Sequence, residues 1–310
     1  MSFQYPAENG ASDSTHVVLQ TFKHNRIVED MTISTRRLLA GEETEVLRFL
    51  NRQPLKNVQM LGLIKDHGLE HPANRGTFYG CFEAGRLICV ALLGHCVFLD
   101  GPLEAIEALA RTAGPSHHPD IHVVLGDIEQ VKAFDLALRQ PTQPSTIKRD
   151  ESQCLFVVNE TSQDAVKLEG LKLAQVEELD EITRLHAWAC FEEYGINPLL
   201  SDPVGFTRRV LARIEKKRTW ILRKDERIIF KADIAAQTDE AAYLEAIWTR
   251  PEMRRTGVGS RALRDVCQRL LSQHSVVCLL ADAFEDHLIT FYQRIGFEVL
   301  FRYGLVRYSS

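Results

Sequence analysis

The most informative stretch of the chain is residues 243–260, which read YLEAIWTRPEMRRTGVGS. The part from Tyr243 to Thr249 is apolar and rich in β-forming residues, which predicts a strand. Two glycines, Gly257 and Gly259, follow, and from there apolar residues recur at helical spacing to about residue 272. The stretch therefore predicts a strand, a loop rich in glycine and arginine, and a helix that opens at the end of the loop.

The loop has the features of a diphosphate-binding site. Gly257 and Gly259 lack a Cβ atom, so a bulky ligand can approach the backbone and a positive φ costs little. The amides that precede the helix converge at its N-terminus, where the dipole is equivalent to roughly half a positive charge. Two arginines add formal charge for phosphates. The candidate residues of this loop are Arg254, Arg255, Thr256, Gly257, Val258, Gly259 and Ser260.

Three classes of nucleotide ligand can be compared with this loop. A P-loop requires G-x-x-x-x-G-K-[ST], which the stretch lacks. A dinucleotide site is a rival, because residues 257–262 fit G-x-G-x-x-A and Asp282 ends the next predicted strand. However, Arg250–Thr256 separate the strand from the glycines, and the residues after Asp282 are too few for the remaining βα units of that fold. The third class is coenzyme A.

The chain length and a break in the hydrophobic pattern indicate two domains. The chain has 310 residues, and a domain takes roughly 150. Prolines and charged residues interrupt the periodicity at Gln140–Asp150, which predicts a boundary. We therefore expect a mobile polar tail at 1–31, a first domain at 32–159 and a second at 160–310.

Both halves show a similar order of elements. The second is expected to hold strand Val166–Leu173, helices Val176–Tyr194 and Asp202–Lys217, strands Thr219–Arg223, Ile228–Ala235 and Tyr243–Thr249, a helix at Ser260–Ser272, strand Val276–Ala281, helix Glu285–Ile295 and a strand pair at Glu298–Tyr308. The first is expected to hold helices Glu42–Asn51 and Val58–Lys65, strands Thr77–Glu83 and Arg86–Gly94, helix Leu103–Thr112, strand His122–Leu125, helix Ile128–Leu138 and a short closing strand Cys154–Val158. The halves therefore resemble a divergent tandem repeat.

Composition excludes several partners and compartments. The net charge of −5 gives no basis for binding a polyanion, so we expect no nucleic acid. The longest apolar run, near Leu87–Leu93, is far shorter than the roughly 20 residues of a membrane span, so we expect no membrane partner. Seven cysteines without a C-x-x-C pair favour a reducing cytoplasm. The sequence also permits a homodimer.

Two motifs together resemble a known family. Arg254-x-x-Gly257-x-Gly259 resembles the [Q/R]-x-x-G-x-[G/A] signature of the GNAT acyltransferase superfamily, and it follows the fourth strand of the second half as in that family. Tyr292, four residues before Gly296-Phe297, resembles the second signature of the family. The whole chain resembles the tandem members, whose N-terminal half has lost the loop. No R-x-x-G-x-G occurs between Gly94 and Leu103.

The resemblance implies an α/β fold in which each half is a twisted mixed β-sheet flanked by helices. It implies that the fourth and fifth strands of the second half splay apart around acetyl-CoA, the co-substrate, without a metal. The main chain of Ile247, Trp248 and Thr249 would then pair with the pantetheine arm. The sequence departs from the family at Glu285, where asparagine is common, and at Leu288, where a small residue is usual.

Acyl transfer to an amine requires a base and an acid. An amine with a pKa of about 10.4 is neutral in only about one molecule in 2,500 at pH 7, so a carboxylate or a water relay is expected to accept the proton. Glu245, which lies mid-strand among apolar neighbours, is the candidate base, with Asp233, Glu192 and Glu193 as lesser candidates. The family motif implies that Tyr292 protonates the leaving thiolate. The alternatives are an arginine-paired Glu245 and a Tyr292 ring that only packs on the sheet.

Two further patterns have ordinary explanations. His117, His118 and His122 lie near prolines without a Cys or Glu at ligand spacing, so we expect loop histidines and no metal. The basic run Arg213–Arg218 is interpreted as a solvated last helical turn.

The leading functional prediction is an N-acetyltransferase that acts on a primary amine of a small metabolite or of a protein lysine. A non-catalytic acyl-CoA-sensing protein and a nicotinamide-dependent oxidoreductase are the alternatives. The acceptor itself cannot be identified from the sequence.

Overall fold

The computed structural model describes residues 33–112, 121–138, 147–160 and 167–308. Residues 32–310 form one compact unit. The predicted tail and most of the predicted boundary at Gln140–Asp150 lie outside the described residues, so the division at residue 159 stays a prediction.

The strands of both halves join in one mixed sheet. Its strand order is β1-β2-β3-β4-β5-β12-β6-β11-β10-β9-β8-β7. The strands are β1 Ser34–Arg37, β2 Gly76–Glu83, β3 Arg86–Gly94, β4 Cys96–Asp100, β5 Val123–Asp127, β6 Ile147–Val158, β7 Leu171–Leu173, β8 Thr219–Lys224, β9 Arg227–Gln237, β10 Ala241–Thr249, β11 Val276–Asp282 and β12 Glu298–Tyr308. The predicted α/β class with mixed, helix-flanked sheets is confirmed, and the sheets of the two halves are continuous.

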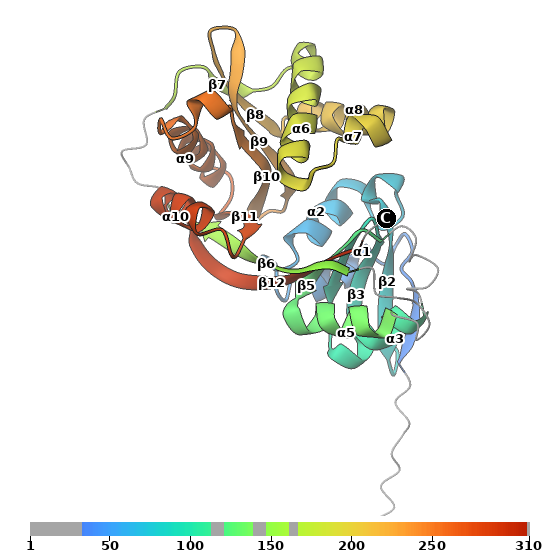
Figure 1. Ribbon diagram of the computed structural model, residues 1–310. Helices are drawn as coiled ribbons and strands as arrows, with labels where there is room; N and C mark the ends of the chain where they lie inside the picture. Colours follow the sequence, from blue (N-terminus) through green and yellow to red (C-terminus); the bar gives the residue numbers. More distant parts are fainter. Residues whose placement is uncertain (1–32, 113–120, 139–146, 161–166, 309–310) are drawn as a thin grey trace, which may run out of the picture. The chain divides into compact units, whose positions relative to one another are not determined.

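Helices cover both faces of this sheet (Figure 1). The α-helices are α1 Glu43–Leu50, α2 Val58–His67, α3 Leu103–Thr112, α5 Ile128–Leu138, α6 Leu179–Tyr194, α7 Pro198–Ser201, α8 Pro203–Glu215, α9 Val258–Leu271 and α10 Asp286–Ile295. Among the described residues, single turns of 3-10 helix are η1 Pro72–Asn74, η3 Val176–Glu178 and η4 Pro251–Met253. In the second half α6 and α8 share one hydrophobic cluster with the sheet, and α9 and α10 share another.

The two halves exchange a strand at the centre of the sheet. β6, the last strand of the first half, pairs with β11 of the second half, and β12 pairs with β5 of the first half. β6 and β12 also pair with each other along most of their length. Figure 1 shows these two long strands passing between the halves. The strand order consequently reads the same way from either end, with β4–β5 and β10–β11 as the two parallel pairs.

Two strand predictions at this centre are corrected, and two short strands of the first half were missed. The region Glu298–Tyr308 is one strand and not a strand pair, because a local irregularity between Val299 and Phe301 shifts the register without breaking the strand. β6 begins at Ile147, so it is much longer than the predicted Cys154–Val158. The short strands β1 and β4 were not predicted, since each has five residues or fewer and lacks a clear alternation.

A capping motif marks the start of helix α8 in the second half. The Asp202 side chain accepts a hydrogen bond from the Gly205 amide at 2.9 Å, and Pro203 occupies the first turn of α8, as predicted. The predicted strand Val166–Leu173 is shorter, with β7 covering only its last three residues and Val166 lying outside the described ranges.

Helix α2 of the first half packs directly on β9 of the second. A Cβ atom at Gly62 would lie 2.6 Å from the Ala236 Cβ, so glycine is required for this close approach. At the end of the same helix, Asp66 accepts hydrogen bonds from Arg218 at 2.8 Å and from Lys216 at 3.2 Å. These contacts hold the start of β8 and the end of α8 against the first half.

Candidate functional site

Strands β10 and β11 separate halfway along β10. Their parallel pairing runs from Ala241–Val276 to Leu244–Leu279 and then stops. β10 continues to Thr249, paired only with β9 on its other side. The predicted splay between the fourth and fifth strands of the second half is therefore present, and it begins beside Glu245.

A β-bulge lies at the start of the splay. Glu245 pairs with Asp233 and Trp248 with Lys231, so β10 has one more residue than β9 between these pairs. The extra residue lets Ala246 adopt a positive φ of 48°. Beyond the bulge Ile247 packs with the α9–α10 cluster and Trp248 with the α6–α8 cluster. The edge of β10 at Ile247, Trp248 and Thr249 is thus turned toward the opening, where β11 no longer pairs with it.

The glycine loop connects this edge to α9. Arg255 and Gly257 both have a positive φ, 62° and 80° respectively, and Gly257 is the N-cap of the helix. The first helical hydrogen bond runs from the Arg261 amide to the Gly257 carbonyl at 3.1 Å. The amides of Val258, Gly259 and Ser260 therefore have no helical acceptor, as in any first turn, and can bind an anion.

The two glycines serve different purposes. Space around the Gly257 Cα is open, with no atom within 4 Å of the place that a Cβ would take, so a ligand can approach this residue. A Cβ atom at Gly259 would lie 2.6 Å from the Thr249 Oγ1 atom. The expectation that both glycines leave room for ligand is therefore corrected for Gly259, which instead lets the start of α9 contact the end of β10.

The two arginines of the loop have different surroundings. Arg254 donates to the Thr249 carbonyl at 3.0 Å and to Glu192 Oε2, on α6, at 2.8 Å. Glu192 also accepts from the Trp248 indole nitrogen at 3.1 Å, so this lesser base candidate joins the loop to α6. Arg255 is exposed, and among the described residues it forms no ion pair. Arg255 is therefore the better placed of the two arginines for a phosphate.

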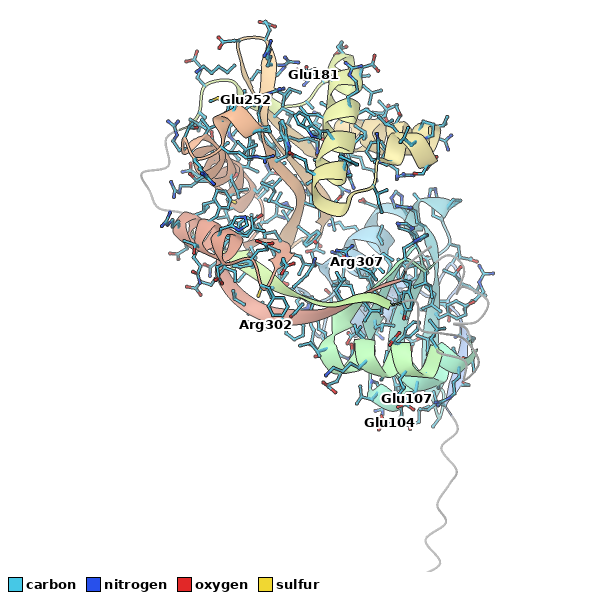
Figure 2. All side chains as sticks on the ribbon, viewed as in Figure 1. Glu104, Glu107, Glu181, Glu252, Arg302 and Arg307 are labelled. Carbon is cyan, nitrogen blue, oxygen red and sulfur yellow. The ribbon has the colours of Figure 1, made fainter. Side chains whose placement is uncertain are left out.

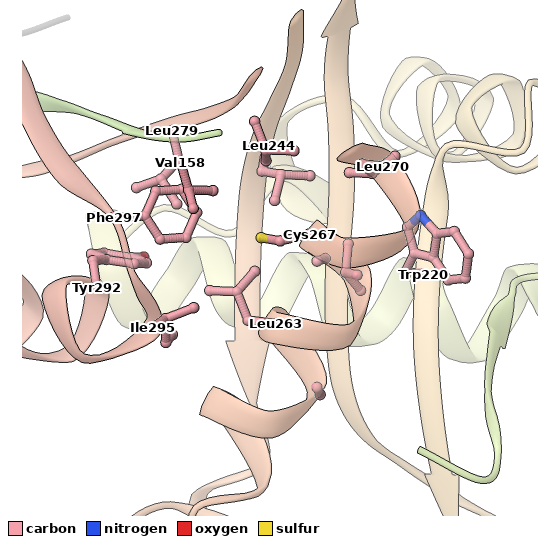
Figure 3. Close-up of a cluster of buried hydrophobic side chains, with 14 of the residues drawn as sticks. Val158, Trp220, Leu244, Leu263, Cys267, Leu270, Leu279, Tyr292, Ile295 and Phe297 are labelled. Atoms are coloured by element: carbon pink, nitrogen blue, oxygen red, sulfur yellow. The ribbon is translucent and has the colours of Figure 1, made fainter. Parts of the chain in front are cut away.

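Tyr292 lies in the hydrophobic cluster beneath α10. Its side chain is 8% exposed, and its ring lies 5.3 Å from the Phe156 ring and 5.8 Å from the Phe297 ring. Figure 3 shows Tyr292 beside Ile295, Phe297 and Val158. The ring packs as the alternative interpretation expects, and its role as an acid stays a prediction.

Glu245 is paired with a cation and does not sit in an apolar environment. The Arg213 guanidinium forms an ion pair with Glu245 and another with Asp233, at 3.2 Å. The Glu245 side chain is 37% exposed. The sequence argument for Glu245 as a desolvated carboxylate is therefore wrong, because a residue of α8, distant in sequence, supplies the compensating charge.

A buried pair of charged residues, Lys231 and Asp233, lies next to this ion pair. Lys231 and Asp233 on β9 are each 1% exposed, and the Lys231 Nζ lies 2.5 Å from Asp233 Oδ2. Burial opposes ionisation of Asp233, but attraction to Lys231 and then to Arg213 outweighs it and lowers the pKa of Asp233 to about 2. His186 on α6 lies 3.6 Å from Asp233, and burial holds the pKa of His186 well below its ordinary value. Asp233 is thus an ionised structural carboxylate.

Sequence reasoning missed Lys231, Arg213 and His186. A signal for the first was present, because Lys231 and Asp233 lie two residues apart in an apolar strand and so face the same side. The interpretation of the basic run Arg213–Arg218 as a solvated turn is wrong at both ends. Arg213 binds Glu245 and Asp233, while Arg218 is only 9% exposed and binds Asp66 of α2.

Other sequence candidates lie away from this region. Of the loop histidines, His117 and His118 fall outside the described residues, and the His122 ring lies 4.4 Å from the His95 ring. Within the described ranges, no three side chains of His, Cys, Asp or Glu gather as a metal-binding group. None of the helices in those ranges is long and apolar enough to cross a bilayer. Glu193 is in α6, but its side chain is not among those described, and Glu285 Oε2 lies 3.0 Å from His287 Nδ1.

Comparisons with known proteins agree with the motifs. Residues 215–299 match the family model described as an acetyltransferase (GNAT) domain. Comparison with curated proteins gives no match.

Solved structures share the fold across both halves. A GNAT-family acetyltransferase from Colwellia psychrerythraea superposes with a TM-score of 0.57 at 12% identity, covering 90% of this chain and 100% of that chain. A tandem GNAT protein from the clavulanic acid biosynthesis pathway gives 0.55 at 12% identity, covering 89% and 98%. A GCN5-related N-acetyltransferase from Sphaerobacter thermophilus gives 0.57 at 13% identity, covering 89% and 95%.

The separated strands β10 and β11 and the glycine loop lie within the residues that match this family model. Residues 215–299 thus resemble an acetyltransferase (GNAT) domain, and the chain shares its fold with a tandem GNAT structure.

Proposed function

We propose that the protein is an N-acetyltransferase that moves the acetyl group of acetyl-CoA to a primary amine. The proposal rests on one observation, which is that the end of β10 and the start of α9 are in contact at Thr249 and Gly259. The unpaired edge of β10 ends at Thr249, and the N-terminus of α9 begins in contact with it. A ligand with an extended amide-containing arm and a diphosphate can use both features at once.

The residues fit this ligand as follows. The amides of Val258, Gly259 and Ser260, with the exposed Arg255, would hold the diphosphate. The main chain of Ile247, Trp248 and Thr249 would pair with the pantetheine arm. Arg254 donates to Glu192 on α6, so a phosphate contact by Arg254 would link the bound ligand to α6.

The chemistry needs an activated thioester, a deprotonated amine and a proton for the departing thiolate. Acetyl-CoA supplies the thioester. Glu245 pairs with Arg213 at the bulge and is 37% exposed, so it would accept a proton directly or through water. Tyr292 would donate the proton to the thiolate; donation from a phenol of pKa about 10 to a thiolate of pKa about 8.5 is uphill by only about 2 kcal/mol.

The test is release of free thiol from acetyl-CoA in the presence of a panel of primary amines. We expect amine-dependent thiol release and stabilisation of the protein against heat by coenzyme A. Stabilisation by NAD and not by coenzyme A would contradict the proposal.

A second candidate function is acyl-CoA sensing without turnover. It is favoured by the ion pair that neutralises Glu245 and by the packing of the Tyr292 ring. Binding of coenzyme A without thiol release from any amine would support this function over the first.

Replacement of Tyr292 by phenylalanine tests the acid directly. We expect turnover to fall by roughly 10²-fold, the lower range for loss of a general acid, while coenzyme A affinity stays the same because the ring is kept. The matched control is Tyr303→Phe, which removes a buried hydroxyl that donates to the Lys56 carbonyl at 2.8 Å. Equal turnover of Tyr292→Phe and the parent protein would remove the acid role.

A further inference from the structure

Helix α6 is fixed across the sheet of the second half at both of its ends. Near its N-terminus Glu181, labelled in Figure 2, forms an ion pair with Arg223 on β8 and accepts a hydrogen bond from the Ile228 amide on β9 at 3.3 Å. Near its C-terminus Glu192 accepts from the Trp248 indole at 3.1 Å. The side of α6 that carries Glu192 is therefore turned toward the end of β10.

Three side chains contact the Trp248 indole and fix its position. Beside the hydrogen bond to Glu192, the Arg250 guanidinium lies 5.7 Å from the centre of the ring, and the Trp188 ring lies 5.9 Å from it at an angle of 57°. The main chain of Trp248 belongs to the edge of β10 that β11 leaves unpaired, where we expect the pantetheine arm. Trp248 therefore joins the proposed donor site to α6.

Two aromatic residues of α6 remain open to solvent at this place. Trp188 is 42% exposed and Phe191 is 57% exposed. Phe191 and Glu192 follow Trp188 by three and four residues, so all three lie on one side of the helix. Because Trp188 and Glu192 both contact Trp248, this side borders the end of β10.

Exposed apolar side chains continue along the chain into α7 and α8. Ile196, Leu200 and Val204 are each more than half exposed. Elsewhere in the described ranges, exposed large apolar residues occur singly or as one adjacent pair. Single residues of this kind are ordinary on a protein surface, whereas several of them beside an opening in the fold are typical of a ligand-binding site.

The exposed rings lie within reach of the proposed reaction centre. Glu245, the candidate base, lies at the bulge where β10 and β11 begin to separate, and Trp248 follows it by three residues of the same strand. Three residues of strand span roughly 10 Å. A primary amine beside Glu245 can therefore place a substituent of this length against Trp188.

We propose that the acceptor is a primary amine with a large apolar substituent, such as an aryl group, and that Trp188 and Phe191 of α6 bind this substituent. The inference rests on the proposed acetyltransferase function and adds the chemical class of the acceptor. Removal of an apolar group from water onto these rings is favourable, and an aryl group gains further from edge or offset contact with them. The two residues therefore raise the affinity for the acceptor and leave the chemical step unchanged.

The experiment compares amines of equal reach and different polarity. The thiol-release assay is run with the full chain and 4-phenylbutylamine, n-butylamine or 4-amino-1-butanol. We expect 4-phenylbutylamine to exceed n-butylamine by about 10-fold or more in kcat/KM, mainly through KM, as for burial of one phenyl group. Equal rates for the three amines, or a preference for the aminoalcohol, would overturn the inference while leaving the proposed function intact.

Variants assign the effect to the aromatic residues. Trp188→Ala should lower kcat/KM for 4-phenylbutylamine by about 10-fold and Phe191→Ala by about 5-fold, with little change for n-butylamine, and Trp188→Phe should keep part of the activity that Trp188→Ala loses. The matched control is Leu136→Ala, at an exposed apolar residue of α5 in the first half. An equal loss with both amines would indicate a structural role and contradict the inference.

A binding measurement tests the inference without turnover. Calorimetric titration of 4-phenylbutylamine into the protein saturated with coenzyme A should show binding that is weakened in Trp188→Ala and kept in Leu136→Ala. Binding that is equal in the parent and both variants, or absent in the parent, would overturn the inference. Failure of the proposed function has a different signature, since coenzyme A itself would then not bind.

Sedimentation velocity identifies the competing occupant of this face, a second copy of the chain. We expect Trp188→Ala and the parent protein to sediment with the same oligomeric state. A parent dimer that Trp188→Ala converts to a monomer, together with equal rates for the three amines, would assign the exposed rings to self-association and overturn the inference.

Discussion

Replacement of Gly257 by glutamate is expected to lower the affinity for coenzyme A on the order of 10³-fold, equivalent to about 4 kcal/mol. Gly257 has a φ of 80° and caps α9, and the space around its Cα is open. A glutamate there fills the approach to the backbone and places a negative charge at the helix terminus proposed to bind phosphates. The affinity is measured by isothermal titration of coenzyme A.

The control for this variant is Gly85→Glu. Gly85, in the turn between β2 and β3, has a φ of 77° and likewise has no atom within 4 Å of an added Cβ. The two variants therefore share the backbone strain, the added charge and the exposure, and differ only in position. Loss of affinity in Gly257→Glu with normal affinity in Gly85→Glu supports the loop as the diphosphate site. Normal affinity in both would exclude it, and with it the proposed function.

The loop could be predicted from sequence because its determinants are local. Strand, glycines and helix follow one another within residues 243–271, and the resulting order is seen in β10, η4 and α9. The capping of α8 by Asp202 is local in the same sense. Hydrogen bonds and φ preferences between near neighbours fix such features, so a single sequence contains them.

The features that escaped prediction depend on partners distant in sequence. The exchange of β6 and β12 between halves is decided by pairing between residues far apart in the sequence, such as Val158 with Val277 and Asp127 with Tyr303. Arg213 meets Glu245 32 residues away, and Gly259 meets Thr249 through packing of α9 on β10. The sequence identified Glu245, Tyr292 and both glycines as notable, but only the folded chain shows what each of them contacts.

The second large effect is expected from replacement of Lys231 by methionine. Methionine has a similar volume but no charge, so Asp233 is left ionised and 1% exposed with only Arg213 and His186 nearby. Removal of one partner from a buried pair costs about 3–5 kcal/mol. We therefore expect the free energy of unfolding in urea at pH 7 to fall by that amount. Lys224→Met, at the exposed end of β8, should leave it nearly unchanged.

A double variant shows why the charge matters. In Lys231→Met/Asp233→Asn the carboxylate is removed as well, so most of the lost stability should return, since an uncharged buried pair needs far less compensation. If the double variant is less stable than Lys231→Met, the Asp233 carboxylate still stabilises the fold through Arg213 after the lysine is removed, and the expected rescue is contradicted. In the double variant Arg213 would also lose its ion pair with residue Asp233 and keep only its ion pair with Glu245. A change in turnover of the double variant without a change in coenzyme A affinity would then show that this buried carboxylate positions Glu245 at the bulge.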